Sequence, residues 1–248
     1  MTGSWRPAVC VAARTETPTA RSIRLRVDGL GPVVAGQHID IRLTADDGYQ
    51  AVRSYSLSAT PVGGPLGVPL ADDEVEITVE ELPEGEVSPY LVQGLEPQDA
   101  LEVRGPIGGW FVWRDTDPDP VQLIGGGSGV APLVAMLRAR VAGRSPVPMR
   151  LLTSVRTPES LYFGDELRRL AEVPGIGVDV AYSREAPAGE VRPAGRLTAG
   201  DIAAFVQEPG AGTVFVCGRT SFVAAVTDLL IARGHDPASI RTERFGGA

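Results

Sequence analysis

Three short segments in the first half of the chain alternate apolar and charged residues with a period of two. They span residues 23–28, 39–43 and 75–80. Because successive side chains of a strand point to opposite faces, this alternation predicts half-buried β-strands. Turn-forming runs rich in Gly, Asp and Pro separate these segments at 28–32, 46–48 and 63–65. Short strands at this spacing predict a small antiparallel β-barrel.

The second half follows a different pattern, in which short apolar runs alternate with longer helical segments. Strands are expected at 121–124, 149–153, 178–182 and 214–217, and helices over 132–140, 160–171 and 221–233. For the last helix, Thr220 is the expected N-cap and Gly234 the residue that ends it. Strand–loop–helix alternation predicts an α/β domain with a parallel sheet, the architecture of many nucleotide-binding domains.

The segment 114–120 separates the two patterns and is rich in Asp and Pro, so we expect an interdomain linker there. Residues 1–115 are then the barrel domain and residues 121–248 the α/β domain. A chain of 248 residues is long enough for two such cores. The first 120 residues carry a net charge of -10 and the rest +2, which makes the second half the better place for a phosphate-bearing ligand.

Composition excludes several functional classes. The net charge of -8 argues against non-specific nucleic-acid binding. No stretch approaches the roughly 18 apolar residues of a transmembrane helix, and residues 1–6 do not open a signal peptide. Cys10 and Cys217 are too few for a disulfide framework or a four-cysteine iron–sulfur site, and we expect no metal site. A reducing cytoplasm fits these features.

The run from Gly125 to Pro132 (GGGSGVAP) follows an apolar strand and opens a helix. Glycines let the backbone approach a pyrophosphate closely, and the helix N-terminus supplies N–H groups and a favourable dipole. The run departs from the usual G-x-G-x-x-G fingerprint through its third Gly and its closing Pro. A tight strand-to-helix turn is the alternative reading.

Four weaker motifs accompany it. Arg53-Ser54-Tyr55-Ser56 combines groups for phosphate or ribityl oxygens with a flat ring, although, taken alone, the motif is better explained as a plain strand. The run 85–91 (GEVSPYL) offers N–H groups to a second phosphate or forms an ordinary N-cap. The run 214–220 (VFVCGRT) ends a strand in Cys-Gly, where a buried packing cysteine is the simpler explanation. The tail 242–248 is either disordered or folded back onto a ring.

In this order and spacing, the motifs resemble those of the ferredoxin–NADP reductase superfamily. The resemblance runs from Gly36-Gln37-His38-Ile39-Asp40 to Glu243-Arg244-Phe245 and so covers nearly the whole chain. It implies an N-terminal flavin-binding antiparallel barrel and a C-terminal NAD(P)-binding α/β domain, in agreement with the strand and helix patterns.

The resemblance also implies roles for individual residues. Arg53 and Ser54 belong to the flavin-binding strand, with Arg53 on the phosphate. Tyr55 stacks on the isoalloxazine and Ser56 bonds near its N5 atom. The pyrophosphate is held by Gly85, Val87 and Ser88, an element typical of the branch that uses FAD more than of the FMN branch. The residues expected to line the nicotinamide-nucleotide cleft are Gly126, Gly127, Ser128 and Gly129. Those expected near the reacting rings are Cys217, Gly218, Glu243 and Phe245, so that Tyr55, Ser56, Cys217 and Glu243 form the expected catalytic set.

A second group of residues bears on the choice of nicotinamide. Ser154 and Arg156 follow one strand, and Ser183 and Arg184 follow the next. Relatives that use NADP place a Ser and an Arg here on the 2′-phosphate, so the resemblance favours NADPH, with NADH as the alternative. Two surface arginines are the simpler reading. Arg219 stands where the family often has Pro, and Ser128 where Thr is commoner. Three residues follow Phe245, so its stacking geometry is left open.

The resemblance implies an FAD-dependent NAD(P)H oxidoreductase. Hydride would pass from NADPH to bound FAD, and electrons on to a separate protein such as a ferredoxin, an oxygenase or another metalloenzyme component. Two alternatives remain at this point. One is a reductase that uses free flavin as a substrate. The other is a non-catalytic flavin- or nucleotide-binding regulatory subunit.

Overall fold

The computed structural model describes residues 3–66 and 68–246. Met1 and Thr2, at the start of the segment read for an export signal, lie outside the described residues, as do Gly247 and Ala248 at the end of the tail. The fold divides into two compact units. One holds Met1–Arg114 with Val134–Gly143, and the other holds Asp115–Leu133 with Arg144–Ala248.

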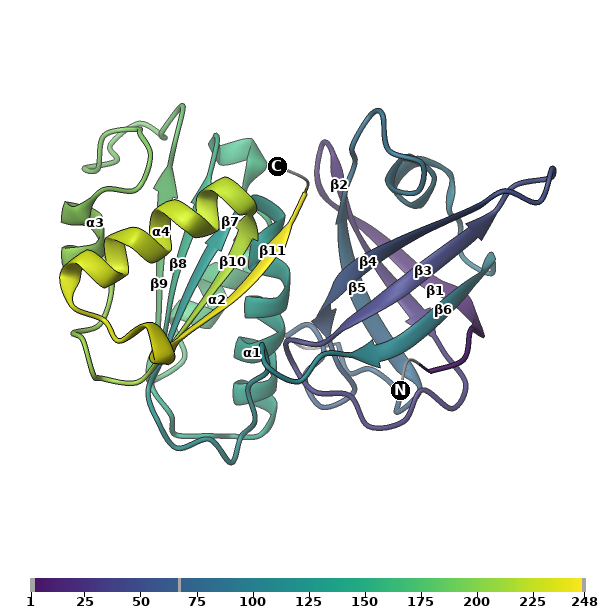
Figure 1. Cartoon of the computed structure of the whole chain (residues 1–248), viewed down its shortest axis with the longest axis horizontal. Coiled ribbons are helices and arrows are strands. Elements are labelled where there is room, and N and C mark those ends of the chain that lie inside the picture. Colours follow the sequence, from purple (N-terminus) through teal and green to yellow (C-terminus); the bar gives the residue numbers. More distant parts are fainter. Residues whose placement is uncertain (1–2, 67, 247–248) are drawn as a thin grey trace. The chain divides into compact units, whose positions relative to one another are not determined.

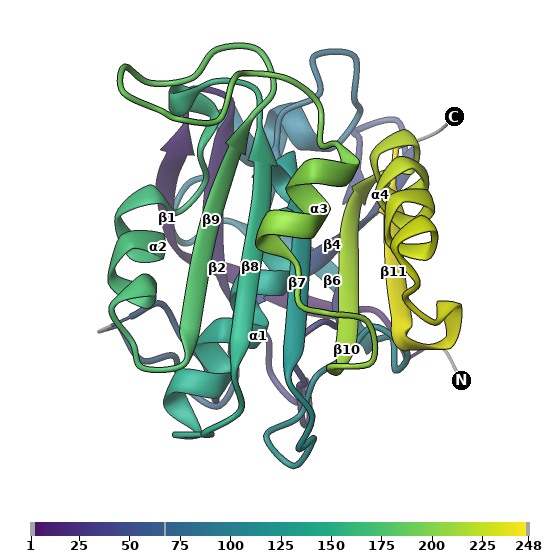
Figure 2. The same ribbon diagram turned by 90° about the vertical axis from the view of Figure 1, so that its left-hand side faces the viewer.

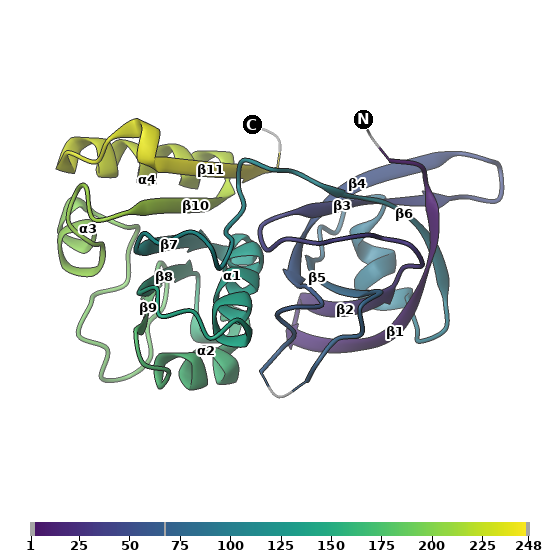
Figure 3. The ribbon, with the colours of Figure 1, turned by 90° about the horizontal axis from the view of Figure 1, so that it is seen from below.

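The first unit is a closed antiparallel barrel with strand order β1-β2-β5-β4-β3-β6, seen in Figure 3. Its strands are β1 (Arg6–Thr17), β2 (Ala20–Arg26), β3 (His38–Thr44), β4 (Gln50–Ala59), β5 (Glu74–Glu80) and β6 (Ala100–Ile107). Ile23, Leu25 and Ile77 face inward and are fully buried, as their alternation predicts. A short π-helix, Tyr90–Gly94, follows the loop after β5. The predicted barrel is confirmed.

The second unit is a five-stranded parallel sheet with strand order β11-β10-β7-β8-β9 (Figure 2). Its strands are β7 (Val121–Gly126), β8 (Met149–Val155), β9 (Ile176–Tyr182), β10 (Thr213–Arg219) and β11 (Ile240–Phe245). The helices α3 (Ala199–Phe205) and α4 (Thr220–Arg233) lie on one face and α2 (Gly164–Ala171) on the other (Figures 2 and 3). The predicted α/β architecture is confirmed.

The helix α1 (Val130–Ala142) opens directly after β7, and a 3₁₀ turn at Gly127–Gly129 joins the two elements (Figure 1). Its first residues, Val130–Leu133, belong to the second unit and the remainder groups with the barrel unit. Further 3₁₀ turns lie at Pro158–Ser160 and Pro237–Ser239. No helix among the described residues is long and apolar enough to cross a membrane.

Two details of the predicted helices are wrong. The helix expected over 160–171 begins only at Gly164, because Phe163 has a left-handed φ of 56° that interrupts helical backbone geometry. Thr220 is the first residue of α4 and not its N-cap, which is Arg219. The Thr220 hydroxyl instead donates to the Gly246 carbonyl at 3.2 Å. Gly234 ends α4 with a left-handed φ of 104°, as expected.

Candidate active site

The predicted flavin-binding strand is part of β4 and pairs with the segment that opens the family resemblance. In the antiparallel register, His38 lies opposite Ser56, Ile39 opposite Tyr55, and Ile41 opposite Arg53. The two motifs are therefore neighbouring strands of one surface. Arg53 is exposed, whereas Tyr55 and Ser56 are half-buried. The exposure of the candidate side chains therefore decreases along the strand, from Arg53 in solvent to Tyr55 and Ser56 at the edge of the barrel core.

Ser54 has a structural partner within the barrel. Its hydroxyl donates to Asp40 Oδ1 at 2.6 Å, and Arg104 donates to Asp40 Oδ2. Burial by itself would raise the pKa of Asp40, but the hydrogen bonds from Ser54 and Arg104 outweigh it and hold that pKa below its ordinary value. Asp40 is thus an ionised anchor beneath the motif, and the side chain of Ser54 serves this anchor.

Tyr55 packs against the barrel core. Burial raises the pKa of its hydroxyl to about 12, although the Arg53 charge opposes the shift. The side chain is therefore a neutral phenol at physiological pH. A neutral, partly buried aromatic ring is suited to stacking on a flat heterocycle.

The loop between β5 and the π-helix contains Gly85, Val87 and Ser88. Val87 is fully buried in the barrel core, so its side chain anchors the loop and does not face a ligand. Ser88 is buried, and its hydroxyl accepts the Leu82 N–H at 3.0 Å. A Cβ on residue 85 would lie 2.9 Å from the Ser88 hydroxyl and 3.0 Å from the Leu82 carbonyl. Gly85 therefore keeps the loop backbone closed on itself.

Glu86 is a functional candidate that the motif contained but that was not singled out. Its carboxylate accepts hydrogen bonds from Arg53 Nη2 at 2.5 Å and from the Tyr49 hydroxyl at 2.6 Å. The residue expected to bind flavin phosphate thus already holds an anion. The opposite charges of Arg53 and Glu86, both within predicted phosphate-binding motifs, were the available signal.

In the second unit, every predicted nucleotide-binding segment lies at the carboxyl ends of the parallel strands. The glycine loop follows β7, Ser154 lies near the end of β8 with Arg156 directly after it, and the Cys217–Arg219 segment ends β10. The strand order runs outward from β7 in both directions, with β8 and β9 on one side and β10 and β11 on the other. The β7–β10 junction is therefore the topological switch point, where open α/β sheets bind ligands.

Close backbone packing builds this junction. A Cβ on residue 129 would lie 2.4 Å from the carbonyl oxygen of Cys217, so only glycine fits there. Gly127 has a left-handed φ of 57°, whereas a Cβ at that position would meet nothing within 4 Å. Ser128 lies between them in the 3₁₀ turn. The loop thus presents bare backbone at the mouth of the switch point, as pyrophosphate binding requires.

Phe222, near the start of α4, was not predicted to belong to this site. Its ring lies so close to Gly126 and Gly218 that a Cβ on either glycine would approach it to 2.7 or 2.8 Å. The ring therefore forms an aromatic wall beside the two glycines. Phe222 is 96 positions from Gly126 in the chain. The register between β7 and β10 was needed to bring them together.

Cys217 is fully buried on β10, between Gly125 of β7 and Glu243 of β11 in the sheet register. Burial raises the pKa of its thiol well above the ordinary value, and the Glu243 charge acts in the same direction. The side chain is accordingly a protonated thiol at physiological pH and not a thiolate nucleophile. If Cys217 lies beside the nicotinamide, as predicted, its role there is to pack against the ring and not to react with it.

The residues expected to select the nicotinamide lie on adjacent strand ends. The N–H of Ser183 donates to the Val155 carbonyl at 2.8 Å, and the N–H of Arg184 donates to the Arg156 carbonyl at 3.0 Å. Arg156 and Arg184 are both exposed. The guanidinium groups of Arg156 and Arg184 thus extend from two backbone segments that are hydrogen-bonded to each other. Glu185 is also bonded to the Arg156 carbonyl, so an acidic residue, which sequence reasoning did not identify, stands beside this basic pair.

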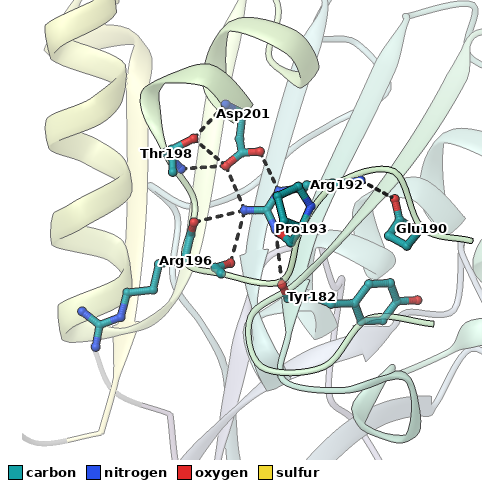
Figure 4. A network of polar contacts seen from close by, with 8 residues as sticks. Tyr182, Glu190, Arg192, Pro193, Arg196, Thr198 and Asp201 are labelled. Carbon is teal, nitrogen blue, oxygen red and sulfur yellow. Dashed lines mark hydrogen bonds and ion pairs between the residues drawn. The ribbon is translucent and has the colours of Figure 1, made fainter. Parts of the chain in front are cut away.

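A nearly buried ion pair fixes the loop that begins at Ser183 (Figure 4). Arg192 donates to both carboxylate oxygens of Asp201, at 2.6 and 2.9 Å, and to the Tyr182 carbonyl at 3.3 Å. These bonds, with further ones from Thr198, lower the pKa of Asp201 to about 2. Because Tyr182 directly precedes Ser183, the pair holds the loop to the strand end that carries the selectivity residues.

The last element among the described residues is the strand β11. Glu243 and Phe245 lie on β11, which pairs in parallel with β10 so that Phe245 is the partner of Arg219. Both residues are half-buried. Of the two expectations for this segment, disorder and a folded-back tail, the strand agrees better with the second. The approach of Glu243 and Phe245 to a flavin remains a prediction.

These features suit the groups that the resemblance implies. Flavin phosphates would be held by Arg53 and by the backbone around Gly85, and the isoalloxazine would meet Tyr55 and Ser56. The bare glycine backbone at the switch point suits a nicotinamide dinucleotide. Among the described residues, no group of three or more His, Cys, Asp or Glu side chains is arranged to hold a metal ion.

Comparison with known proteins agrees with this geometry. Residues 20–112 match the oxidoreductase FAD-binding domain and residues 123–228 the oxidoreductase NAD-binding domain. The chain is 30% identical to the glycine betaine monooxygenase reductase subunit of Chromohalobacter salexigens, over 96% of this chain and 63% of that protein. It is 29% identical to a ferredoxin–NAD(P)(+) reductase component of Ralstonia, over 90% and 64%. The chain thus spans less than two thirds of these relatives.

Solved structures share the fold. The FAD/NAD-binding domain of a nitric oxide dioxygenase from Vibrio cholerae superposes with a TM-score of 0.83 at 24% identity, and each chain is fully covered. A cytochrome P450 reductase from Amycolatopsis gives a TM-score of 0.80 at 26% identity, over 99% of this chain and 71% of that one.

Fold, site and domain matches together define a two-domain protein that binds FAD through its barrel and NAD(P) through its α/β unit. The chain belongs to the ferredoxin–NADP reductase superfamily.

Proposed function

We propose that this protein is an NADPH-dependent, FAD-containing reductase that passes electrons to a separate acceptor protein. The observation that carries the proposal is the presence, on one chain, of an FAD-binding barrel and a closely packed glycine loop at the switch point of a parallel sheet. When bound, the flavin accepts a hydride from the nicotinamide and supplies electrons to the next carrier.

The chain's own residues bind and orient in this scheme. Arg53 supplies positive charge for the flavin phosphates, and the neutral Tyr55 ring supports the isoalloxazine. Gly129 keeps the loop against the Cys217 carbonyl, which leaves room for the dinucleotide backbone. The buried thiol of Cys217 packs behind the glycine loop without introducing charge.

NADPH is proposed as the preferred donor because Arg156 and Arg184 extend from bonded strand ends, beside Ser154 and Ser183. A guanidinium group can donate two parallel hydrogen bonds to a phosphate. NADPH has a 2′-phosphate that accepts them, whereas the ribose of NADH has only a hydroxyl at that position. Arg156→Ala should lower kcat/KM for NADPH about tenfold or more and leave that for NADH nearly unchanged. Arg168→Ala, on the exposed face of α2, is the control. An unchanged NADPH preference in the Arg156 variant would remove it from the argument.

The acceptor is proposed to be a ferredoxin, an oxygenase or another metalloenzyme component. Relatives are named as reductase subunits or components of monooxygenase and dioxygenase systems. Cys10 and Cys217 are both free and buried, which suits a reducing compartment such as the cytoplasm.

Anaerobic mixing with NADPH tests the proposal. The protein purified with FAD should lose the absorbance of oxidised flavin on addition of NADPH, and more slowly with NADH. Retention of FAD through gel filtration distinguishes it from a reductase of free flavin. If neither nucleotide bleaches a protein that retains FAD, the chain is a binding subunit and the proposal fails.

A further inference from the structure

We propose that Glu86 is a built-in competitor for the flavin phosphates, a carboxylate that occupies Arg53 and must be displaced before FAD binds fully. This inference rests on the proposed function and concerns the affinity of the barrel for its cofactor. It makes Glu86 a residue that sets how tightly FAD is held.

The geometry places the carboxylate on the guanidinium itself. Glu86 Oε2 lies 2.5 Å from Arg53 Nη2, and Arg53 Nη1 donates to the Val52 carbonyl at 2.8 Å. A phosphate oxygen cannot occupy the position that Glu86 Oε2 already fills. The Tyr49 hydroxyl holds the other carboxylate oxygen at 2.6 Å, so the carboxylate is fixed from both sides.

The position of Glu86 in the chain gives the contact its significance. Glu86 stands between Gly85 and Val87, within the loop whose backbone is expected to hold the pyrophosphate. Hydrogen bonds from Tyr49 and Arg53 lower the pKa of Glu86, so the carboxylate is ionised at neutral pH. A diphosphate that binds to the backbone of this loop therefore lies close to the negative charge of the Glu86 carboxylate.

Displacement is feasible because the pair is exposed. The side chains of Arg53 and Glu86 are 50% and 44% exposed, and exposed ion pairs contribute little to stability. Glu86 can turn into water when the FAD diphosphate, which carries two negative charges in total, takes its place on Arg53. Its charge nevertheless stays close to the bound diphosphate, and like charges at short range weaken binding.

The experiment titrates the flavin-free protein with FAD and follows the quenching of flavin fluorescence. Glu86→Gln keeps the shape of the side chain and removes its charge, whereas Glu86→Ser also removes its reach. Both variants should bind FAD about three- to tenfold more tightly than wild type. Glu84→Gln is the matched control, since Glu84 is exposed on the same loop and is not part of the Arg53–Glu86–Tyr49 cluster.

The outcomes separate cleanly. Tighter binding in both Glu86 variants with Glu84→Gln unchanged supports the proposal. Equal or weaker binding in the Glu86 variants would overturn it, because Glu86 would then position Arg53 instead of competing for it. An equal gain in Glu84→Gln would also overturn it, since general surface charge would explain the effect. If neither wild type nor either Glu86 variant binds FAD, the proposed function fails and this inference fails with it, whereas FAD binding with equal affinity in all variants overturns this inference alone.

Discussion

The two units build their candidate sites from different materials. In the barrel, the site consists of charged and polar side chains on an exposed strand and loop, with Arg53 paired to Glu86. In the α/β unit, it consists of backbone in close contact, with Gly129 against Cys217 and the Phe222 ring against Gly126 and Gly218. The barrel site should therefore respond to charge, and the glycine loop at the switch point to volume.

The largest expected effect comes from adding one carbon to the nucleotide loop. Gly129→Ala would place a Cβ 2.4 Å from the Cys217 carbonyl oxygen, where two backbones must separate. We expect a loss of about 2–3 kcal/mol in the stability of the α/β unit and about 100-fold weaker NADP⁺ binding. Thermal unfolding and equilibrium binding of NADP⁺ measure the two effects.

Gly127→Ala is the matched control for that substitution. Its Cβ meets nothing within 4 Å, so it carries only the cost of a left-handed residue, about 1 kcal/mol. Similar losses in the two variants would show that the loop is sensitive to conformation and not to volume.

The next effect concerns the Arg192–Asp201 pair, which is nearly buried. The pKa of Asp201 falls in the fold from an ordinary 3.8 to about 2, so the carboxylate stabilises the folded state above pH 4. Asp201→Asn should cost about 2 kcal/mol in the free energy of unfolding between pH 5 and pH 8. As pH falls from 4 toward 2 the carboxylate of the wild type becomes protonated, and the difference should shrink.

The control for this prediction is Asp165→Asn, which removes an exposed partner of Arg168 and should cost less than about 0.5 kcal/mol. Chemical denaturation at several pH values gives the comparison. A stability difference that grows on acidification would contradict the assigned direction of the pKa shift.

A smaller effect is expected for charge in the barrel. Arg53→Gln should weaken FAD binding about tenfold and leave the melting temperature nearly unchanged, because its ion pair is exposed. Arg42→Gln, which removes a second barrel arginine paired with Glu102, should leave FAD affinity unchanged. Fluorescence titration and thermal melts test both variants. A large drop in melting temperature for Arg53→Gln would mean that the residue is structural.

The smallest effect is predicted at Tyr55. Burial raises the pKa of its hydroxyl to about 12, so the side chain stays neutral up to about pH 10. The pH dependence of FAD affinity between pH 7 and pH 10 should therefore be the same in wild type and Tyr55→Phe. A step near pH 10 that is present only in wild type would contradict the burial of this group.

The sequence predicted those elements whose pattern is local. Alternation identified β2, β3 and β5, and apolar runs identified β7 to β10. It did not identify β1, whose apolar and polar positions alternate irregularly, or β6, where Leu101 and Val103 alternate with Glu102 and Arg104 over too few residues. Phe163 interrupted a helix because nothing in the sequence signals a left-handed aromatic residue.

The site was predictable to the extent that its residues lie within contiguous motifs. Contacts between residues far apart in the chain could not be predicted from the sequence. Phe222 lies beside Gly126 only because the strands that carry the two segments pair in the sheet, and Glu86 contacts Arg53 across 33 positions. The Arg192–Asp201 pair is only nine residues apart but depends on the path of an irregular loop.

The most direct test of the central claim is anaerobic rapid mixing of the FAD-bound protein with NADPH, with wild type beside Gly129→Ala, observed at the absorbance of oxidised flavin. If the barrel holds FAD and the α/β unit supplies the electron donor, wild type bleaches and the variant keeps its FAD but bleaches far more slowly. Bleaching of the variant at the wild-type rate, or no bleaching of wild type, would contradict the account.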